Sequence, residues 1–500
     1  MGTKKLAILF LFSVILAFAA GYFSSNLVES KMVIESDEIF NYITKAFDEY
    51  YYYDIDSDDV YDAFIESMYA VVDSYAANHN DPYTKITAVI PSVANKNVES
   101  YVGMGLDFYF DQNDLRVIDV DPTSDLYLKL YPYDLITGVM IDEQPIYFDD
   151  LASTDEVLTY LTGSVGDEKQ IIVENPSDET YTVDFMYQEI LTPSAYAKDL
   201  GSNDIGYIKI DHFNGYEQGV SVGTNYVFNE VLNTLESSIL EGENKTLIID
   251  LRDNPGGSLT ALTNQGTNLN PGITQLLLPY NLSQPLFSMV DKKDDVTTYY
   301  GGLSQLKPYD IKVLVNGNSA SASEVLAASL STYGYMLYGS NTYGKGVYQN
   351  SIYLNDIRNI SYYLTYTEGV WNYGDNLNVS TDPLLVESLD QSGILTLDLP
   401  IFMKELSYDQ VDSNLINYQK FFNTYFNLDE GSMIRTDGYF DQSTEDYIKQ
   451  YQSEHGIPQS GKIDLETARF VYLDFKVMSS LLSNDIQLHS LITLIQNQYV

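Results

Sequence analysis

The chain of 500 residues contains no cysteine, only four histidines and a single tryptophan. Without cysteine it forms no disulfide, offers no cysteine-ligated zinc site and has no thiol nucleophile. It also lacks an HExxH pair and a G-x-S-x-G sequence. These two absences exclude a thermolysin-like zinc site and argue against an α/β-hydrolase. The sequence therefore argues against a cysteine-dependent enzyme, a thermolysin-like zinc enzyme and an α/β-hydrolase.

Positive charge is scarce as well, with 26 Lys+Arg against 71 Asp+Glu and a formal net charge of -45. A surface this acidic repels phosphate backbones, so we expect no nucleic-acid partner. The acidic residues are scattered rather than grouped, which favours solubility over an acidic tail. The length and the 45% hydrophobic content are enough for several packed domains.

The N-terminus carries an export signal. Lys4 and Lys5 precede an apolar run from Leu6 to Phe23, and Ala17-Phe18-Ala19 would serve as a cleavage site. Basic residues before such a run keep the N-terminus in the cytoplasm and send the rest of the chain across the membrane. Residues 1–26 are therefore predicted to be a signal peptide or a membrane anchor. The alternative is a buried core helix.

The rest of the chain divides by its patterns into five parts. Residues 27–95 read as helical, with apolar spacing over 36–47 and 58–74. Residues 96–188 hold short β-rich runs punctuated by prolines, and predict a small separate domain. Residues 401–475 read as a small helical domain, and 476–500 as one more amphipathic helix.

The part between them, residues 189–400, alternates strands and helices. Strands are predicted at 205–210, 247–251, 311–315 and 335–338, with helices within 216–240 and 322–331. The strand at 247–251 is almost continuously apolar, as expected inside a sheet that is covered on both faces. This pattern predicts a layered α/β core.

A cluster of small residues, Asn316-Gly-Asn-Ser-Ala-Ser-Ala-Ser-Glu324, joins a predicted strand to a predicted helix. Small side chains let a substrate backbone approach, and the N–H groups at a helix start favour developing negative charge. Ser321 is thus well placed to be a nucleophile beside an oxyanion hole. The alternative is structural, with Ser319 or Ser321 capping the helix and Glu324 completing a capping box.

Lys345 lies between Gly344 and Gly346 in a stretch otherwise poor in positive charge. A serine hydroxyl needs a base, and lysine serves as one only when desolvation keeps it neutral. The alternative is a surface turn with a solvated lysine. Gly256 and Gly257, which follow the buried strand, present either a simple turn or backbone N–H donors for an anion.

Three segments together resemble the signatures of the carboxyl-terminal processing (tail-specific) peptidases, serine–lysine enzymes with an inserted PDZ domain. The segments are Asp250-Leu-Arg-Asp-Asn-Pro-Gly-Gly257, Ser319-Ala-Ser-Ala-Ser-Glu324 and Tyr343-Gly-Lys-Gly-Val-Tyr-Gln349. The resemblance implies an α/β protease core with crotonase- or ClpP-like layers. It also implies specific roles: Ser321 is the nucleophile, Lys345 the base and Gln349 the residue that orients the lysine. The implied oxyanion hole combines the N–H of Ala322 with that of Gly256 or Gly257, and no metal or cofactor is needed.

The resemblance extends along most of the chain. Tyr101-Val-Gly-Met-Gly-Leu-Asp-Phe108 looks like a PDZ carboxylate-binding loop, in which Val102, Gly103, Met104, Gly105 and Leu106 would hold a peptide C-terminus. Residues 404–475 resemble a peptidoglycan-binding-like helical domain. Members that combine these parts dimerise through their terminal regions, so a homodimer and contact with peptidoglycan are expected partners beside the substrate's C-terminus.

These observations predict an extracytoplasmic serine endopeptidase that processes proteins near their C-termini. One alternative is a peptide-binding scaffold with a weak or inactive core. It is favoured by the 24-residue separation of Ser321 and Lys345, one less than the usual pattern, and by Asn376–Pro383, which replaces the family's Gly-Ile-x-Pro segment. Another alternative is a cell-wall-binding protein acting through residues 404–475.

Overall fold

The computed structural model describes residues 57–89, 99–151, 153–216, 222–264, 271–357 and 360–498. These residues fall into two units, the first formed by 1–91 with 348–368 and the second by 92–347 with 369–500. The apolar run at 6–23 and the helix predicted at 36–47 lie outside the described residues. Within the described ranges no helix combines the length and apolar character needed to cross a membrane.

The first unit joins segments that are far apart in the sequence. Helix α3 (Ser57–Asn78) confirms the helix predicted at 58–74, and it leads to strand β1 (Lys85–Val89). β1 pairs antiparallel with the first part of β18 (Ile360–Tyr373), with Lys85 opposite Thr365. Asp81 accepts hydrogen bonds from Thr84 Oγ1 at 2.6 Å and from Thr367 Oγ1 at 3.0 Å. Residues 348–368, which the sequence pattern assigned to the core, therefore belong to one unit with β1 and pair with it through β18.

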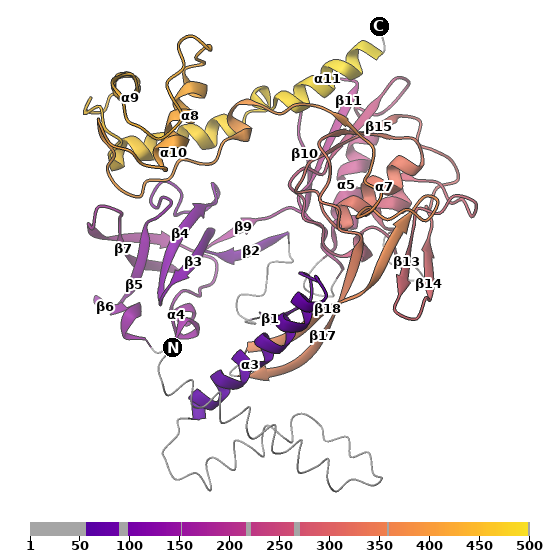
Figure 1. Ribbon diagram of the computed structural model, residues 1–500, viewed down its shortest axis with the longest axis horizontal. Coiled ribbons are helices and arrows are strands. Elements are labelled where there is room, and N and C mark those ends of the chain that lie inside the picture. The colour runs from indigo at the N-terminus through magenta and orange to yellow at the C-terminus, as the bar shows by residue number, and fades with distance from the viewer. Residues whose placement is uncertain are drawn as a thin grey trace, which may run out of the picture. The chain divides into compact units, whose positions relative to one another are not determined.

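The second unit begins with a small β domain (purple in Figure 1). Its main sheet has the order β3-β4-β5-β7-β8, with β6 on β5, and a separate ribbon pairs β2 with β9. The strands are β2 (Ser100–Gly103), β3 (Leu106–Asp111), β4 (Asp114–Val120), β5 (Leu135–Ile141), β6 (Gln144–Tyr147), β7 (Glu168–Glu174), β8 (Thr180–Met186) and β9 (Gln188–Leu191), with helix α4 at Thr154–Tyr160. Leu115, Ile136 and Phe148 lie fully buried in its core. Strand β3 lies at an edge of this sheet, since within the described ranges it pairs with β4 alone.

The segments at 250–257 and 319–324 follow two strands of a second six-stranded sheet, which has the order β10-β11-β12-β15-β16-β19. Its strands are β10 (Ala195–Ala197), β11 (Ile205–Ile210), β12 (Thr246–Asp250), β15 (Asp310–Val315), β16 (Met336–Gly339) and β19 (Val386–Ser388). β11, β12, β15, β16 and β19 run parallel, and every residue of β12 is buried, as its apolar run predicts. Helices α5 (Thr224–Glu236), α6 (Ile273–Leu277) and α7 (Ala322–Thr332) contribute to the same core. The α/β layering predicted for this region is thus present.

The remaining elements complete this unit. β13 (Phe287–Asp291) pairs with β14 (Val296–Tyr299) and with residues 369–373 of β18. β17 (Val347–Ile357) belongs to the first unit from Tyr348 on. Helices α8 (Leu415–Tyr425), α9 (Gln442–Glu454) and α10 (Leu465–Ser480) share one aromatic-rich core. The single helix predicted over 476–500 is wrong. α10 runs to Ser480, and a separate helix α11 (Ile486–Gln498) begins after Asp485, whose carboxylate accepts the N–H of Leu488.

Candidate active site

Ser321 stands at the junction between the end of β15 and helix α7. It is the N-cap residue of α7 and has φ 57° and ψ -119°, a conformation that non-glycine residues rarely adopt. Such strain persists where the surrounding contacts enforce it and is concentrated at functional sites. The neighbouring serines have structural roles. Ser319 Oγ donates to the carbonyl of Leu251 at 2.8 Å, and Ser323 Oγ donates to the carbonyl of Asn254 at 2.9 Å.

The glycine loop after β12 packs directly against Ser321. A Cβ on Gly256 would lie 2.8 Å from Ser321 Cβ and 2.9 Å from the nitrogen of Ala322, so only glycine fits there. Asn254 Oδ1 accepts the N–H of Gly256 at 2.8 Å. Among the described residues, the N–H groups of Gly257 and Ala322 meet no acceptor. The glycine loop and the first residue of α7 thus each keep one N–H group without an acceptor in the described part of the chain, at Gly257 and Ala322, whereas the N–H of Gly256 is occupied.

One carboxylate connects the Ser321 segment to the Lys345 segment. Glu324 is fully buried, and its Oε2 accepts the N–H of Ser321 at 2.9 Å and the N–H of Lys345 at 2.8 Å. Its Oε1 accepts the N–H of Gly344 at 2.6 Å. The capping-box interpretation of Glu324 and the catalytic interpretation of Ser321 are thus compatible, because the cap also binds the loop that carries the lysine.

The other side of the Lys345 loop is held by two residues to which the sequence pattern assigned no role. Trp371, the sole tryptophan, donates its indole N–H to the carbonyl of Lys345 at 2.8 Å. Asn378 Nδ2 donates to the carbonyl of Gly346 at 2.9 Å, and a Cβ on Gly346 would lie 1.9 Å from Asn378 Oδ1. Asn378 comes from the segment that departs from the family pattern. No local pattern could have found these contacts, which join residues 26 to 32 positions apart.

Gln349, the third predicted catalytic residue, lies on β17 in the first unit. Its side-chain nitrogen is buried and meets no acceptor among the described residues. Its role in orienting the lysine stays a prediction.

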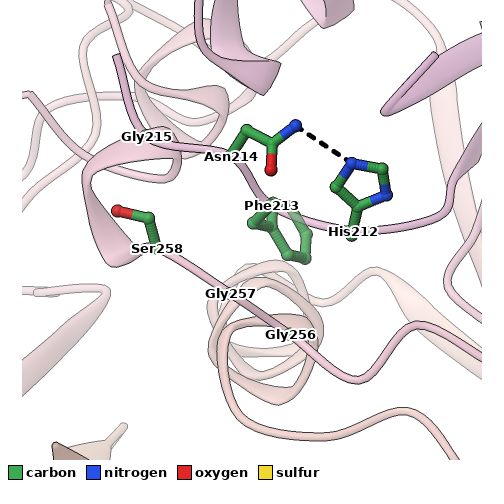
Figure 2. A pocket seen from close by; sticks show the side chains of 7 residues that line it. All are labelled: His212, Phe213, Asn214, Gly215, Gly256, Gly257 and Ser258. Atoms are coloured by element: carbon green, nitrogen blue, oxygen red, sulfur yellow. Dashed lines mark hydrogen bonds between the residues drawn. The ribbon is translucent and has the colours of Figure 1, made fainter. Parts of the chain in front are cut away.

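A pocket of 360 Å³ opens beside the glycine loop (Figure 2). Its lining residues are His212, Phe213, Asn214, Gly215, Gly256, Gly257 and Ser258. Asn214 Nδ2 and His212 Nε2 lie 3.0 Å apart, so the amide fixes the imidazole in the pocket wall. If a peptide places its carbonyl group against Gly257, the side chain of the adjacent peptide residue can reach this pocket.

An ion pair lies behind the same loop. Asp250, at the end of β12, and Arg252 are both buried, and Arg252 Nη2 lies 2.6 Å from Asp250 Oδ2. Burial by itself would raise the pKa of Asp250, but the charges of Arg252 and Lys209 lower it below its ordinary value. Asp250 therefore stays ionised and is an anchor rather than a proton carrier. The described residues hold no cluster of histidine and carboxylate side chains suited to a metal ion.

The predicted carboxylate-binding loop of the β domain joins β2 to edge strand β3. The carbonyl of Met104 accepts Ser124 Oγ at 2.5 Å, and the carbonyl of Gly105 accepts the N–H of Asp121 at 2.9 Å. In the described part of the chain, the N–H groups of Met104 and Gly105 have no acceptor. Gly105 has φ +65°, and a Cβ there would lie 2.7 Å from Ser124 Cβ. Val102 is 46% exposed, and Gly103 and Leu106 are partly exposed on either side of the loop.

Comparison with known proteins identifies the relatives of the chain. The model of peptidase family S41 matches residues 204–372, and a peptidoglycan binding domain model matches residues 412–470. The carboxy-terminal processing protease CtpB of Bacillus subtilis is 23% identical over 474 residues, covering 91% of this chain and 89% of that protein. A CtpA-like serine protease of Staphylococcus aureus is 26% identical over 271 residues, covering 53% of this chain and 48% of that one.

Among solved structures, the photosystem II D1 C-terminal processing protease aligns with 70% of this chain and 88% of its own, at 19% identity and a TM-score of 0.37. The matched S41 segment contains the Ser321 cluster, the glycine loop, Lys345 and Gln349. The chain therefore carries a peptidase family S41 domain and a peptidoglycan binding domain, and it is a serine peptidase related to the carboxy-terminal processing proteases.

Proposed function

We propose that this chain cleaves protein substrates near their C-termini, with Ser321 as nucleophile and Lys345 as general base. The observation that carries the proposal is the shared carboxylate of Glu324, which binds the backbone of both residues. The proposed site combines three features. These are a strained serine at the start of a helix, a glycine-flanked lysine whose loop is bonded from both sides, and two N–H donors without an acceptor among the described residues. The family and relatives of the chain support the same assignment.

The chemistry is acyl transfer. Neutral Lys345 takes the proton from Ser321 Oγ, which attacks the peptide carbonyl and forms a tetrahedral intermediate. The N–H groups of Gly257 and Ala322 stabilise its oxyanion, assisted by the N-terminal end of α7. Protonated Lys345 gives its proton to the leaving amine, and water hydrolyses the acyl-enzyme. Gln349 orients the lysine, as the family resemblance implies.

Substrate selection uses two surfaces. The side chain next to the scissile carbonyl enters the pocket walled by His212 and Phe213. The substrate's C-terminal carboxylate binds the free N–H groups of Met104 and Gly105, and the adjoining residues add a strand to the open edge of β3. We infer from this arrangement that the β domain is a PDZ-type domain, which would give the enzyme a preference for chain ends.

The peptidoglycan binding domain match and the relatives favour an extracytoplasmic enzyme at the cell envelope. Peptidoglycan contact through 412–470 predicts co-sedimentation of the protein with purified sacculi, and recovery only in the supernatant would contradict it. Homodimerisation predicts twice the chain mass in light scattering.

The decisive experiment compares hydrolysis of an unstructured polypeptide with an apolar C-terminus by the wild type, Ser321→Ala and Lys345→Ala. Each variant should lose on the order of 10⁴-fold in turnover while keeping the wild-type melting temperature. Ser304→Ala and Lys293→Ala, both at exposed positions, are the matched controls and should cleave normally. Substantial cleavage by either active-site variant would rule out the serine–lysine pair.

A further inference from the structure

Arg252 stands five residues before Gly257, and its side chain is completely engaged. A guanidinium group has five N–H donors. Nε donates to Asp250 at 3.0 Å, Nη1 donates to Asp485 Oδ1 at 2.9 Å and Gln487 Oε1 at 3.1 Å, and Nη2 donates to Asp250 Oδ2 and Asp485 Oδ2, both at 2.6 Å. Arg252 is only 9% exposed. A cation buried this deeply is tolerated because both sides of its fork meet a carboxylate.

Two of its partners come from the far end of the chain. Asp485 is 7% exposed and directly precedes helix α11, and Gln487 lies in its first turn. Gln487 is itself fixed, since its side-chain nitrogen donates to the carbonyl of Leu389 at 2.6 Å. Leu488, Leu491 and Ile495 of α11 pack against Ile205, Tyr207 and Ile248 of β11 and β12, so the helix lies firmly on the sheet (Figure 1).

The backbone that follows Arg252 is held step by step as far as the glycine pair. Lys209 Nζ donates to the carbonyl of Arg252. The N–H of Asp253 donates to Asn316 Oδ1 at 3.0 Å, and Asn254 Nδ2 donates to the carbonyl of Ile210 at 2.9 Å. Asn254 Oδ1 then accepts the N–H of Gly256. The Arg252 side chain and these bonds together hold the short segment that ends at Gly257, so loosening Arg252 removes one of the anchors of that segment.

We propose that Asp485 and Gln487 are positioning residues for the oxyanion hole, so that helix α11 is part of the catalytic apparatus. The bidentate contact of Asp485 sets the place of Arg252, and Arg252 sets the place of the loop that presents Gly257. This inference rests on the proposed function, in which Gly257 supplies an oxyanion donor. Binding of a substrate's C-terminus at Met104 and Gly105 does not involve these residues.

The test is Asp485→Asn in the full chain, because asparagine is as good an N-cap as aspartate and keeps α11 capped. The change removes the charge and turns one acceptor into a donor that opposes the guanidinium. We expect kcat to fall about 10- to 100-fold, because a small misplacement of a catalytic donor is costly, with a much smaller change in KM. Amide hydrogen exchange should rise over 251–258.

Asp464→Asn is the matched control. Asp464 caps α10 through the N–H of Thr467 at 2.9 Å, as Asp485 caps α11, but it does not contact Arg252. It should keep the wild-type kcat. If Asp485→Asn fails to fold, Gln487→Met is the second variant. Methionine has a volume similar to that of glutamine but lacks the amide oxygen that accepts from Arg252. This variant should still lower kcat and raise amide hydrogen exchange over 251–258.

Asp485→Asn with wild-type kcat and unchanged exchange over 251–258 would overturn the inference. So would an equal loss of activity in Asp464→Asn, which would point to general destabilisation. Ser321→Ala is measured alongside. If it remains active, the proposed function itself has failed, whereas an inactive Ser321→Ala beside a fully active Asp485→Asn refutes only the positioning role.

Discussion

Replacing Glu324 with glutamine perturbs both catalytic segments at once. The carboxylate accepts three backbone N–H groups, from Ser321 and Lys345 on Oε2 and from Gly344 on Oε1. In glutamine one of the two oxygens becomes an amide nitrogen, which accepts no hydrogen bond. The variant therefore loses one bond if the nitrogen takes the place of Oε1 and two bonds if it takes the place of Oε2. Each buried N–H left unpaired costs about 1–3 kcal/mol, and the loss of one or two bonds should therefore lower the free energy of unfolding by roughly 1–6 kcal/mol. That is a large share of a typical protein's stability of about 5–15 kcal/mol.

The effect on catalysis should be larger than the effect on binding. Because the N–H groups of Ser321 and Lys345 share one oxygen, losing it lets the nucleophile and the base separate. We expect kcat to fall by about 10²-fold, with KM nearly unchanged. Guanidinium chloride titration measures the stability, and a fluorogenic peptide measures kcat and KM well below the unfolding midpoint.

Glu445→Gln supplies the control for this experiment. Glu445 also lies in the first turn of a helix, α9, but pairs with the side chain of Lys449 rather than with catalytic backbone. It should lose only a few tenths of a kcal/mol and no activity. Wild-type kcat in Glu324→Gln would refute the idea that this carboxylate aligns the pair.

Two further predictions concern other parts of the chain. Gly346→Ala should lower kcat at least about tenfold, because the added methyl group would displace the side-chain amide of Asn378. Restored activity in the double variant Gly346→Ala, Asn378→Gly would identify that clash as the cause. In the β domain, burial raises the pKa of Asp134 to about 6 although Tyr131 and Tyr181 donate to it. Because the folded state holds the proton of Asp134 more tightly than the unfolded state does, the free energy of unfolding should fall by about 3 kcal/mol as the pH rises from about 4 to 6. A free energy of unfolding that does not change with pH in the wild type would contradict this prediction. So would an Asp134→Asn variant with the same pH dependence as the wild type.

Several elements were predictable from the sequence because local patterns determine them. The strand at 205–210 and the helix at 322–331 were placed within a residue of β11 and α7. Their apolar periodicity and capping residues act over a few neighbours, and such signals survive in a single sequence. The end of α10 was misplaced, because Asp485 stops the chain from continuing as one helix through a capping bond and an ion pair with Arg252.

Sequence motifs were enough to identify the chemical type of this protein. The small-residue cluster at Ser321, the glycine-flanked Lys345 and the glycine pair at 256–257 predicted a serine peptidase, and the family match confirms it. Only the tertiary structure decided which groups hold that chemistry together: the bond from Trp371 to Lys345, the three backbone contacts of Glu324 and the five donors of Arg252. These contacts join residues up to 235 positions apart. A hydrogen bond depends on the meeting of two atoms in space, and sequence patterns report only what neighbouring residues impose on one another.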